Sequence, residues 1–294
     1  MANSYQHTVA NPVTFSGKGL HIGKFARVIL NPAPVNTGIV FQHVDKSGVR
    51  TNIPAHWQYT TPMPFCTCLM ASNGMYIRTV EHLLAACFAC GLDNALIEVH
   101  GNEIPLLDGS AFSMIKAIED VGLQAQTQLK KRIRVLKTVR VEGNNRYLQI
   151  DPAQDFSLDL GVQLAKYGDF HWQGVLTPDS FKAEIAQART YGDVTHGLLA
   201  KTFTAFFTKH PIALGANLNN CIVMFGKHVL NRGGLRMPDE FIRHRILDLM
   251  GDLMLAQAPL IGKITGFNPA HRLNQRLVET ILTDESAWCW DGDK

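Results

Sequence analysis

Residues 239–254, with the sequence DEFIRHRILDLMGDLM, place apolar side chains at helical spacing and are best explained as a buried helix. Beside the apolar stripe, His244 and Asp248 stand four residues apart, so both side chains leave the same flank of the helix. An imidazole and a carboxylate in this arrangement supply two of the three protein ligands of a catalytic zinc site. Asp252 lies one turn further on, where it could orient a metal ligand by a hydrogen bond without binding the metal itself. The pattern equally fits an amphipathic helix with ordinary polar residues on its solvent side.

A second helix offers the missing ligand. In TVEH, residues 79–82, Thr79 is expected to cap a helix whose apolar residues follow at helical spacing and which Gly91 ends. Glu81 and His82 then lie in its first turn, where a zinc ligand and an adjacent carboxylate base can face one cavity. Together with His244 and Asp248, they supply two histidines, one carboxylate ligand and one carboxylate base, which are the groups that a zinc hydrolase requires.

The composition is that of a globular protein, with 46% hydrophobic and 18% charged residues in 294. A net charge of +3 does not argue for nucleic acid as a partner, and the basic run 130–134 is expected to be a solvated linker. No apolar run approaches the ~18–20 residues of a membrane span. The first residues lack the apolar core of a signal peptide, so we expect a cytoplasmic protein with six reduced cysteines.

The order of the predicted elements indicates an α+β fold with two similar domains, 1–125 and 126–294. In each domain strands come first and helices follow, as in a sheet layered against helices. A polar seam at 124–131 separates the two series. Because each domain contributes metal ligands, we expect the zinc in the cleft between them. The sequence does not indicate an oligomeric state.

The segment 197–209 in the second domain places Leu199, Phe203 and Phe207 on one helical face, together with Phe206. This face could line a passage for an acyl chain. It could equally pack against its own domain, as most apolar helix faces do.

Several motifs then resemble one family, the zinc-dependent UDP-3-O-acyl-N-acetylglucosamine deacetylases (LpxC). They are GKGLHIG, NPAPVNTGIVF, TVEHLLAA, LDNALIEV, EIPLLDGSA, ARTYG, LGANLNN, FIRHRILDLMGDL and AHRLNQRLVE. The resemblance runs in order from about Gln6 to Trp288. It implies two α+β domains with the active site between them, and an acylated, UDP-linked amino sugar as substrate.

The resemblance also implies a role for individual residues. The zinc ligands of the family fall on the same three residues as above, His82, His244 and Asp248, and its general base falls on Glu81. Thr190, in ARTYG, matches the hydroxyl that helps to stabilise the oxyanion. His271 matches the group that protonates the leaving amine, and Asp252 matches its acidic partner.

The sequence departs from the family pattern at positions that bind substrate. Arg245 replaces the Lys after the second zinc His, Asn268 replaces a Lys near the diphosphate, and Arg146 replaces another Lys with retention of charge. Gln163–Lys166 stands where the family has Phe-x-His-Pro. The usual Phe-Gly-Phe becomes Tyr191-Gly192-Asp193, followed by a longer insert. We therefore expect substrate contacts from Arg245, Arg146, Tyr191, Leu199, Phe203 and Phe207.

Three interpretations follow. The chain is a divergent deacetylase of lipid A biosynthesis, a paralogue that deacetylates another N-acetylated amino sugar or glycan, or a metal-binding sensor of acyl sugars without turnover. The combination of Glu81, Thr190 and His271 argues against the sensor, because a sensor needs neither a base nor a leaving-group acid.

Overall fold

The computed structural model describes residues 5–194, 203–204, 208 and 210–291. Its first half contains strands β1 (Tyr5–Val9), β2 (Val13–Lys18), β3 (Phe25–Pro32), β4 (Ile39–Val44), β5 (Arg50–Pro54), β6 (Thr60–Thr61), β7 (Cys68–Met70), β8 (Tyr76–Arg78) and β9 (Ala95–His100), with helices α1 (Glu81–Cys90) and α2 (Phe112–Val121). The strands that the sequence predicted for this half are present, and so are the two predicted helices.

The second half contains β10 (Leu123–Leu129), β11 (Ile133–Val135), β12 (Val139–Gly143), β13 (Arg146–Asp151), β14 (Ser157–Leu164), β15 (Gly168–Val175), β16 (Tyr191–Asp193), β17 (Ile222–Phe225), β18 (His228–Val229), β19 (Leu260–Ile261), β20 (Lys263–Phe267) and β21 (Trp288–Trp290). Its helices are α3 (Pro178–Glu184), α5 (Glu240–Leu253) and α6 (His271–Thr283). Helix α3 begins with a capping box, in which the Thr177 hydroxyl accepts from the Ser180 amide and the Ser180 side chain accepts from the Thr177 amide.

Two five-stranded sheets with the same topology form the outer layers of the molecule. Their strand orders are β2-β3-β9-β4-β5 and β12-β13-β20-β14-β15. In both sheets two antiparallel hairpins flank a central strand, which comes last in its sheet along the chain and pairs in parallel with only one neighbour. The repeated topology confirms the predicted α+β class with two similar halves.

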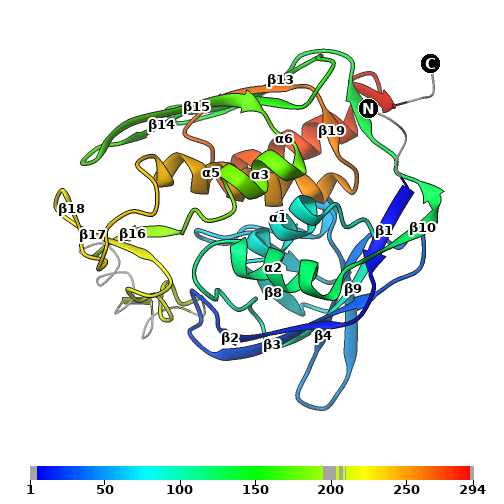
Figure 1. Cartoon of the computed structure of the whole chain (residues 1–294), viewed down its shortest axis with the longest axis horizontal. Helices are drawn as coiled ribbons and strands as arrows, with labels where there is room; N and C mark the ends of the chain where they lie inside the picture. Colours follow the sequence, from blue (N-terminus) through cyan, green and yellow to red (C-terminus); the bar gives the residue numbers. More distant parts are fainter. Residues whose placement is uncertain (1–4, 195–202, 205–207, 209, 292–294) are drawn as a thin grey trace.

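The helices lie between the two sheets, with α1 and α2 towards one sheet and α3, α5 and α6 towards the other (Figure 1). Helices α1 and α5 pack directly against each other across the middle of the molecule. One continuous hydrophobic cluster includes side chains of both sheets and of these helices. Among the described residues, no helix is long and apolar enough to cross a lipid bilayer.

Two segments of the chain differ from what the sequence indicated. Most of the polar seam 124–131 belongs to a strand that the sequence did not indicate, β10, which pairs with β1 through backbone hydrogen bonds. The single strand expected at 134–141 is two strands, β11 and β12, in different sheets. Strand β10 also runs through residue 125, and the domain boundary at that residue stays a prediction.

The start of α1 also differs from its prediction. Thr79 does not cap the helix: its backbone has φ +59°, and its hydroxyl donates to Glu103 Oε1 at 3.0 Å. Val80 occupies the N-cap position without a side-chain hydrogen bond. At the other end Gly91 adopts φ +67°, and its N–H bonds the last carbonyls of the helix as predicted.

Three of the four basic residues in the run 130–134 form ion pairs, contrary to the expected solvated linker. Lys130 lies 3.1 Å from a carboxylate oxygen of Asp93, and Arg132 and Arg134 both contact Asp291, at 2.5 and 2.6 Å. Asp93 belongs to the first half of the chain and Asp291 to the second, so these ion pairs attach the segment to both halves. The prediction of a linker did not include such contacts.

Candidate metal centre and active site

Three buried side chains from the two central helices converge at one point. His82 comes from the first turn of α1, and His244 and Asp248 come from successive turns of α5. One ligand atom from each lies within 4.8 Å of the other two. Asp248 Oδ1 stands 3.4 Å from His244 Nε2 and 3.7 Å from His82 Nε2, so the carboxylate faces both imidazoles.

The chemistry of this cluster fits a divalent metal ion. Burial lowers the pKa of both His82 and His244 to about 3, so both imidazoles are in the neutral form that binds metals. His244 Nδ1 lies 3.2 Å from the Ala188 carbonyl oxygen, which leaves Nε2 directed towards Asp248. Two imidazoles and one carboxylate are a ligand set of catalytic zinc sites.

Glu81 precedes His82 and lies beside the cluster. Its side chain is almost fully buried, and Glu81 Oε2 accepts a hydrogen bond of 3.0 Å from the Thr67 amide. Burial raises the pKa of Glu81 to about 8. A carboxylate whose pKa lies near neutrality is suited to take up a proton and release it again.

His271, at the start of α6, faces Glu81 from the other half of the chain. Its Nε2 lies 3.7 Å from Glu81 Oε1, and its Nδ1 lies 2.9 Å from Asp252 Oδ2. Burial alone would lower the pKa of His271, but the negative charges of Asp252, Glu81 and Asp248 outweigh it and raise the pKa to about 10. The imidazole is therefore held as a cation that can donate a proton from Nε2.

Comparison with known proteins agrees with this geometry. The profile of the LpxC family, UDP-3-O-acyl N-acetylglycosamine deacetylase, matches residues 6–283. The chain belongs to the LpxC family. The UDP-3-O-acyl-N-acetylglucosamine deacetylases of Idiomarina loihiensis and Shewanella violacea are 33% and 35% identical to it. These alignments cover 96% and 97% of the chain, and 91% and 92% of the two relatives.

The segment that carries the ARTYG motif of the LpxC family lies along the metal cluster. Ala188 contacts His244 as described above, and the ring of Tyr191 lies 6.0 Å from the ring of His244, edge to face. Thr190 lies between them, held by backbone hydrogen bonds to Gly109 and Ile222. Thr190 thus stands in sequence between two residues that contact His244, and its role towards an oxyanion stays a prediction.

Arg245 lies beside the cluster and is fixed by Tyr191. Arg245 Nε donates to the Tyr191 hydroxyl at 2.8 Å, and the guanidinium lies over the Tyr191 ring at 5.2 Å from its centre. Its Nη1 is 3.8 Å from Asp248 Oδ2. Arg245 and Tyr191, both expected from the sequence to contact substrate, are therefore in contact with each other.

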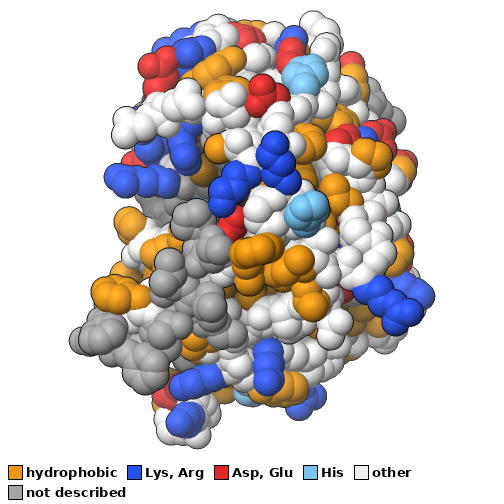
Figure 2. Space-filling view, turned by 90° about the vertical axis from the view of Figure 1, so that its left-hand side faces the viewer, with side chains coloured by type: hydrophobic (Ala, Val, Ile, Leu, Met, Phe, Trp, Pro, Cys, Tyr) orange, Lys and Arg blue, Asp and Glu red, His pale blue; other side chains and the backbone are white. Residues whose placement is uncertain are grey.

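The other expected substrate contacts are less closely tied to the cluster. Arg146 is exposed at the start of β13, opposite Gly143 in a hairpin. Phe203 is 61% exposed. Leu199 and Phe207 lie outside the described residues. Hydrophobic side chains gather on the face of the molecule that carries β16–β18, with Lys and Arg side chains beside them (Figure 2).

Sequence reasoning missed three polar residues of this site. Thr67 is fully buried and contacts Glu81 and Asp252, Asn274 donates to Asp252 Oδ2 at 2.8 Å, and Gln275 donates to the Thr67 hydroxyl at 2.9 Å. Asn274 and Gln275 follow His271 by three and four residues on one helix, a spacing that could have indicated them. Thr67 stands between two buried cysteines and gives no such signal.

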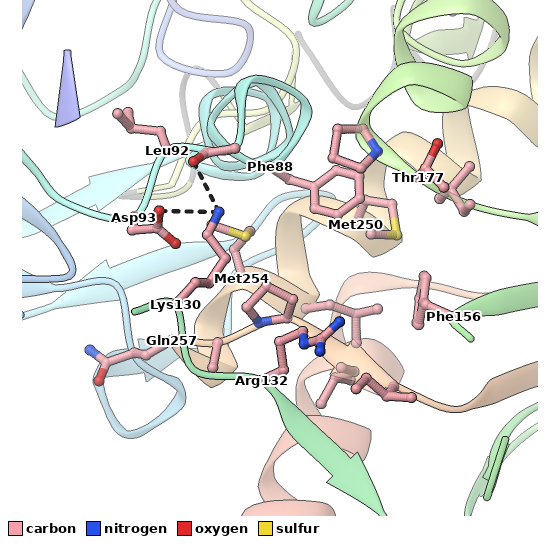
Figure 3. Close-up of a pocket in the computed structure, with 18 of the residues that line it drawn as sticks. Phe88, Leu92, Asp93, Lys130, Arg132, Phe156, Thr177, Met250, Met254 and Gln257 are labelled. Carbon is pink, nitrogen blue, oxygen red and sulfur yellow. Dashed lines mark hydrogen bonds and ion pairs between the residues drawn. The ribbon is translucent and has the colours of Figure 1, made fainter. Parts of the chain in front are cut away.

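A separate cavity of about 380 Å³ lies between the halves near the C-terminal ends of α1 and α5. Phe88, Met250 and Met254 contribute apolar walls, and Lys130 and Arg132 stand at one side (Figure 3). The metal-binding residues do not line it, so this cavity and the metal cluster are distinct.

Proposed function

We propose that this protein is a zinc-dependent amidohydrolase that removes the N-acetyl group of UDP-3-O-acyl-N-acetylglucosamine in lipid A biosynthesis. One observation carries the proposal: a buried two-histidine, one-aspartate cluster has Glu81 and cationic His271 3.7 Å apart at its side. Membership of the LpxC family, and the names of relatives that align over nearly their whole length, support the substrate. We also propose that the reaction takes place in the cytoplasm.

The proposed metal is zinc, held by His82, His244 and Asp248. When bound, zinc supplies Lewis acidity, which polarises the amide carbonyl and makes water easier to deprotonate at neutral pH. The neutral state of both imidazoles supports binding of a soft to borderline divalent ion.

The protein residues have complementary roles in amide hydrolysis. Glu81 accepts a proton from the attacking water, for which its raised pKa is suited. The Thr190 hydroxyl donates a hydrogen bond to the oxygen that gains negative charge, an interaction typically worth a few kcal/mol. His271 then donates its Nε2 proton to the leaving sugar nitrogen. Asp252, at 2.9 Å from His271 Nδ1, keeps this imidazole protonated and oriented.

A second candidate substrate, another N-acetylated amino sugar or glycan without UDP, is favoured by the surroundings of Asn268. Asn268 Oδ1 accepts from the Gln163 amide at 2.8 Å and its Nδ2 donates to the Asn145 carbonyl at 3.3 Å. The side chain that replaces the expected Lys is thus neutral and occupied by backbone groups. Arg245 is likewise held by Tyr191. A diphosphate would meet fewer mobile cations here than the family pattern provides.

The experiment that tests the proposal is acetate release by the zinc-loaded protein. We expect acetate from UDP-3-O-acyl-N-acetylglucosamine, and none after the metal is removed with a chelator until zinc is restored. Acetate from N-acetylglucosamine derivatives without UDP, but none from the nucleotide sugar, would assign the second substrate. Absence of acetate from both classes, with zinc bound, would contradict the deacetylase proposal.

A further inference from the structure

Thr67 joins the two halves of the site from a buried position directly before β7. None of its surface is exposed. Its amide donates to Glu81 Oε2 at 3.0 Å, within the first half of the chain. Its hydroxyl reaches into the second half, where it lies in hydrogen-bond contact with Asp252 Oδ1 on α5 and 2.9 Å from Gln275 Nε2 on α6.

The direction of each hydrogen bond follows from the groups involved. An ionised carboxylate only accepts, so the single proton of the Thr67 hydroxyl points to Asp252. The Gln275 amide donates to the hydroxyl oxygen, which fixes the rotation of the hydroxyl. His271 Nδ1 is 3.3 Å from this oxygen but 2.9 Å from Asp252 Oδ2, so the imidazole donates to the carboxylate.

The result is a continuous chain of contacts from Glu81 through Thr67 and Asp252 to His271. The Thr67 amide holds Glu81 by Oε2 and leaves Oε1 facing His271 Nε2 at 3.7 Å. The Thr67 hydroxyl holds Asp252 by Oδ1 and leaves Oδ2 to hold His271 Nδ1. One residue therefore sets the positions of both groups that exchange protons.

We infer that Thr67 is a positioning residue that fixes the separation of the base Glu81 and the acid His271 across the seam between the halves. The inference rests on the proposed function, which gives those two residues their roles. Thr67 acts through Glu81 Oε2 and Asp252 Oδ1, which are not the atoms that face the partner group in the proposed proton transfers. Its effect is on the geometry in which Glu81 and His271 work, and geometric errors of this kind lower turnover more than substrate binding.

The first test is Thr67→Val, which keeps the shape and the amide but removes the hydroxyl proton. We expect kcat to fall about 10- to 100-fold, the range for loss of a hydrogen bond to a charged group, while KM changes less than ~3-fold. Metal content should stay equal to that of the wild type. Thr67→Ser retains the hydroxyl and should restore kcat to within ~3-fold of the wild type.

The matched control is Thr8→Val, at a second buried threonine whose hydroxyl donates to the Asn94 carbonyl at 2.8 Å. Thr8 lies in β1, and its hydroxyl bonds backbone groups rather than a carboxylate of the site. This variant should lose stability without loss of kcat. An equal fall of kcat in both Val variants would overturn the inference, because the effect would then follow from loosened packing.

A second measurement does not depend on turnover. In the zinc-loaded protein, the Nδ1 resonance of His271 in nitrogen-15 NMR should be the same for wild type and Thr67→Ser and displaced for Thr67→Val. Displacement without any acetate release by the wild type would reject the proposed function but keep the positioning role. If Thr67→Val retains both kcat and the resonance, the inference is wrong. Should that variant not fold, Gln275→Leu, which frees the hydroxyl to rotate, must lower kcat several-fold, and an unchanged kcat overturns the inference.

Discussion

The buried ion pair between Arg189 and Glu240 connects the ARTYG segment to the first turn of α5, and Glu240→Gln is the substitution that tests its importance. Arg189 Nε and Nη2 lie 2.8 and 3.0 Å from the two oxygens of Glu240, which is fully buried. The amides of Arg189 and Arg236 donate to the same carboxylate at 3.0 and 2.7 Å. Glutamine keeps the shape but removes the charge and places an N–H₂ group opposite these donors.

The expected cost follows from this geometry. Removing one member of a buried ion pair typically costs about 3–5 kcal/mol, because the remaining charge is left uncompensated. A chain of this size loses roughly 2–4 °C of Tm per kcal/mol, so we expect Tm to fall on the order of 10 °C. The adjacent Ala188 carbonyl orients His244, so metal affinity should fall about tenfold as well.

Denaturant unfolding of the metal-free protein measures the stability term, and competition with a chelator measures the metal affinity. The control is the double substitution Arg189→Met with Glu240→Gln, which removes both charges, keeps a side-chain oxygen for the two amides, and should be less destabilising than Glu240→Gln alone. A loss below ~1 kcal/mol for Glu240→Gln, or a double variant that is the less stable of the two, would refute the reasoning.

The same pair predicts a dependence of stability on pH. Burial alone would raise the pKa of Glu240, but hydrogen bonds from the Arg189 side chain and from the two amides outweigh it, so the pKa lies below its usual value of 4.5. A depressed pKa in the folded state stabilises the protein above pH 4.5, and this contribution is lost as the pH falls from there through the lowered pKa. Below pH 4.5, the free energy of unfolding should therefore fall less steeply with decreasing pH in Glu240→Gln than in the wild type, as denaturant unfolding at several pH values would measure.

Three further substitutions address the site directly. Glu81→Ala should leave zinc bound, by elemental analysis, and lower kcat at least ~100-fold, and near-normal turnover would contradict its role as base. His82→Ala should purify without stoichiometric metal, and retention of one tightly bound zinc would remove it from the ligand set. Tyr191→Phe removes the hydroxyl that holds Arg245 Nε at 2.8 Å and should change KM several-fold with little change in metal content. An unchanged KM for both candidate substrates would show that this contact does not position substrate.

The two central helices, and the pair of metal-binding residues on α5, could be predicted from the sequence because their signals are local, whereas His82 was joined to that pair only by ligand chemistry and the family resemblance. The four-residue spacing of His244 and Asp248 places both on one flank of α5, and Gly91 ends α1 in the left-handed conformation that glycine adopts readily. Strand β10 could not be predicted in this way. Its residues are mostly exposed and polar, so it lacks the alternation of a half-buried strand, and only its pairing with β1 defines it.

The Thr67 contacts and the Arg189–Glu240 pair escaped prediction for a different reason. Thr67 meets Asp252 from 185 residues away, and Arg189 meets Glu240 from 51 residues away. Side chains that complete a buried polar network depend on tertiary structure, and their identity alone does not separate them from surface residues of the same type. The family resemblance indicated the reacting groups, whereas the groups that hold them became visible only in the fold.

Gly251 shows how a residue that looks unfavourable locally can be required by the site. Glycine in a helix interior costs about 1 kcal/mol of helix stability relative to alanine, so Gly251 is locally unfavourable within α5. In the fold, a Cβ on Gly251 would lie 2.1 Å from the Glu81 carbonyl oxygen, because α1 and α5 cross in backbone contact there. This crossing lies next to Glu81 and His82 on one helix and between Asp248 and Asp252 on the other. The absent side chain therefore allows the two helices to approach until ligands from both halves can share one metal ion.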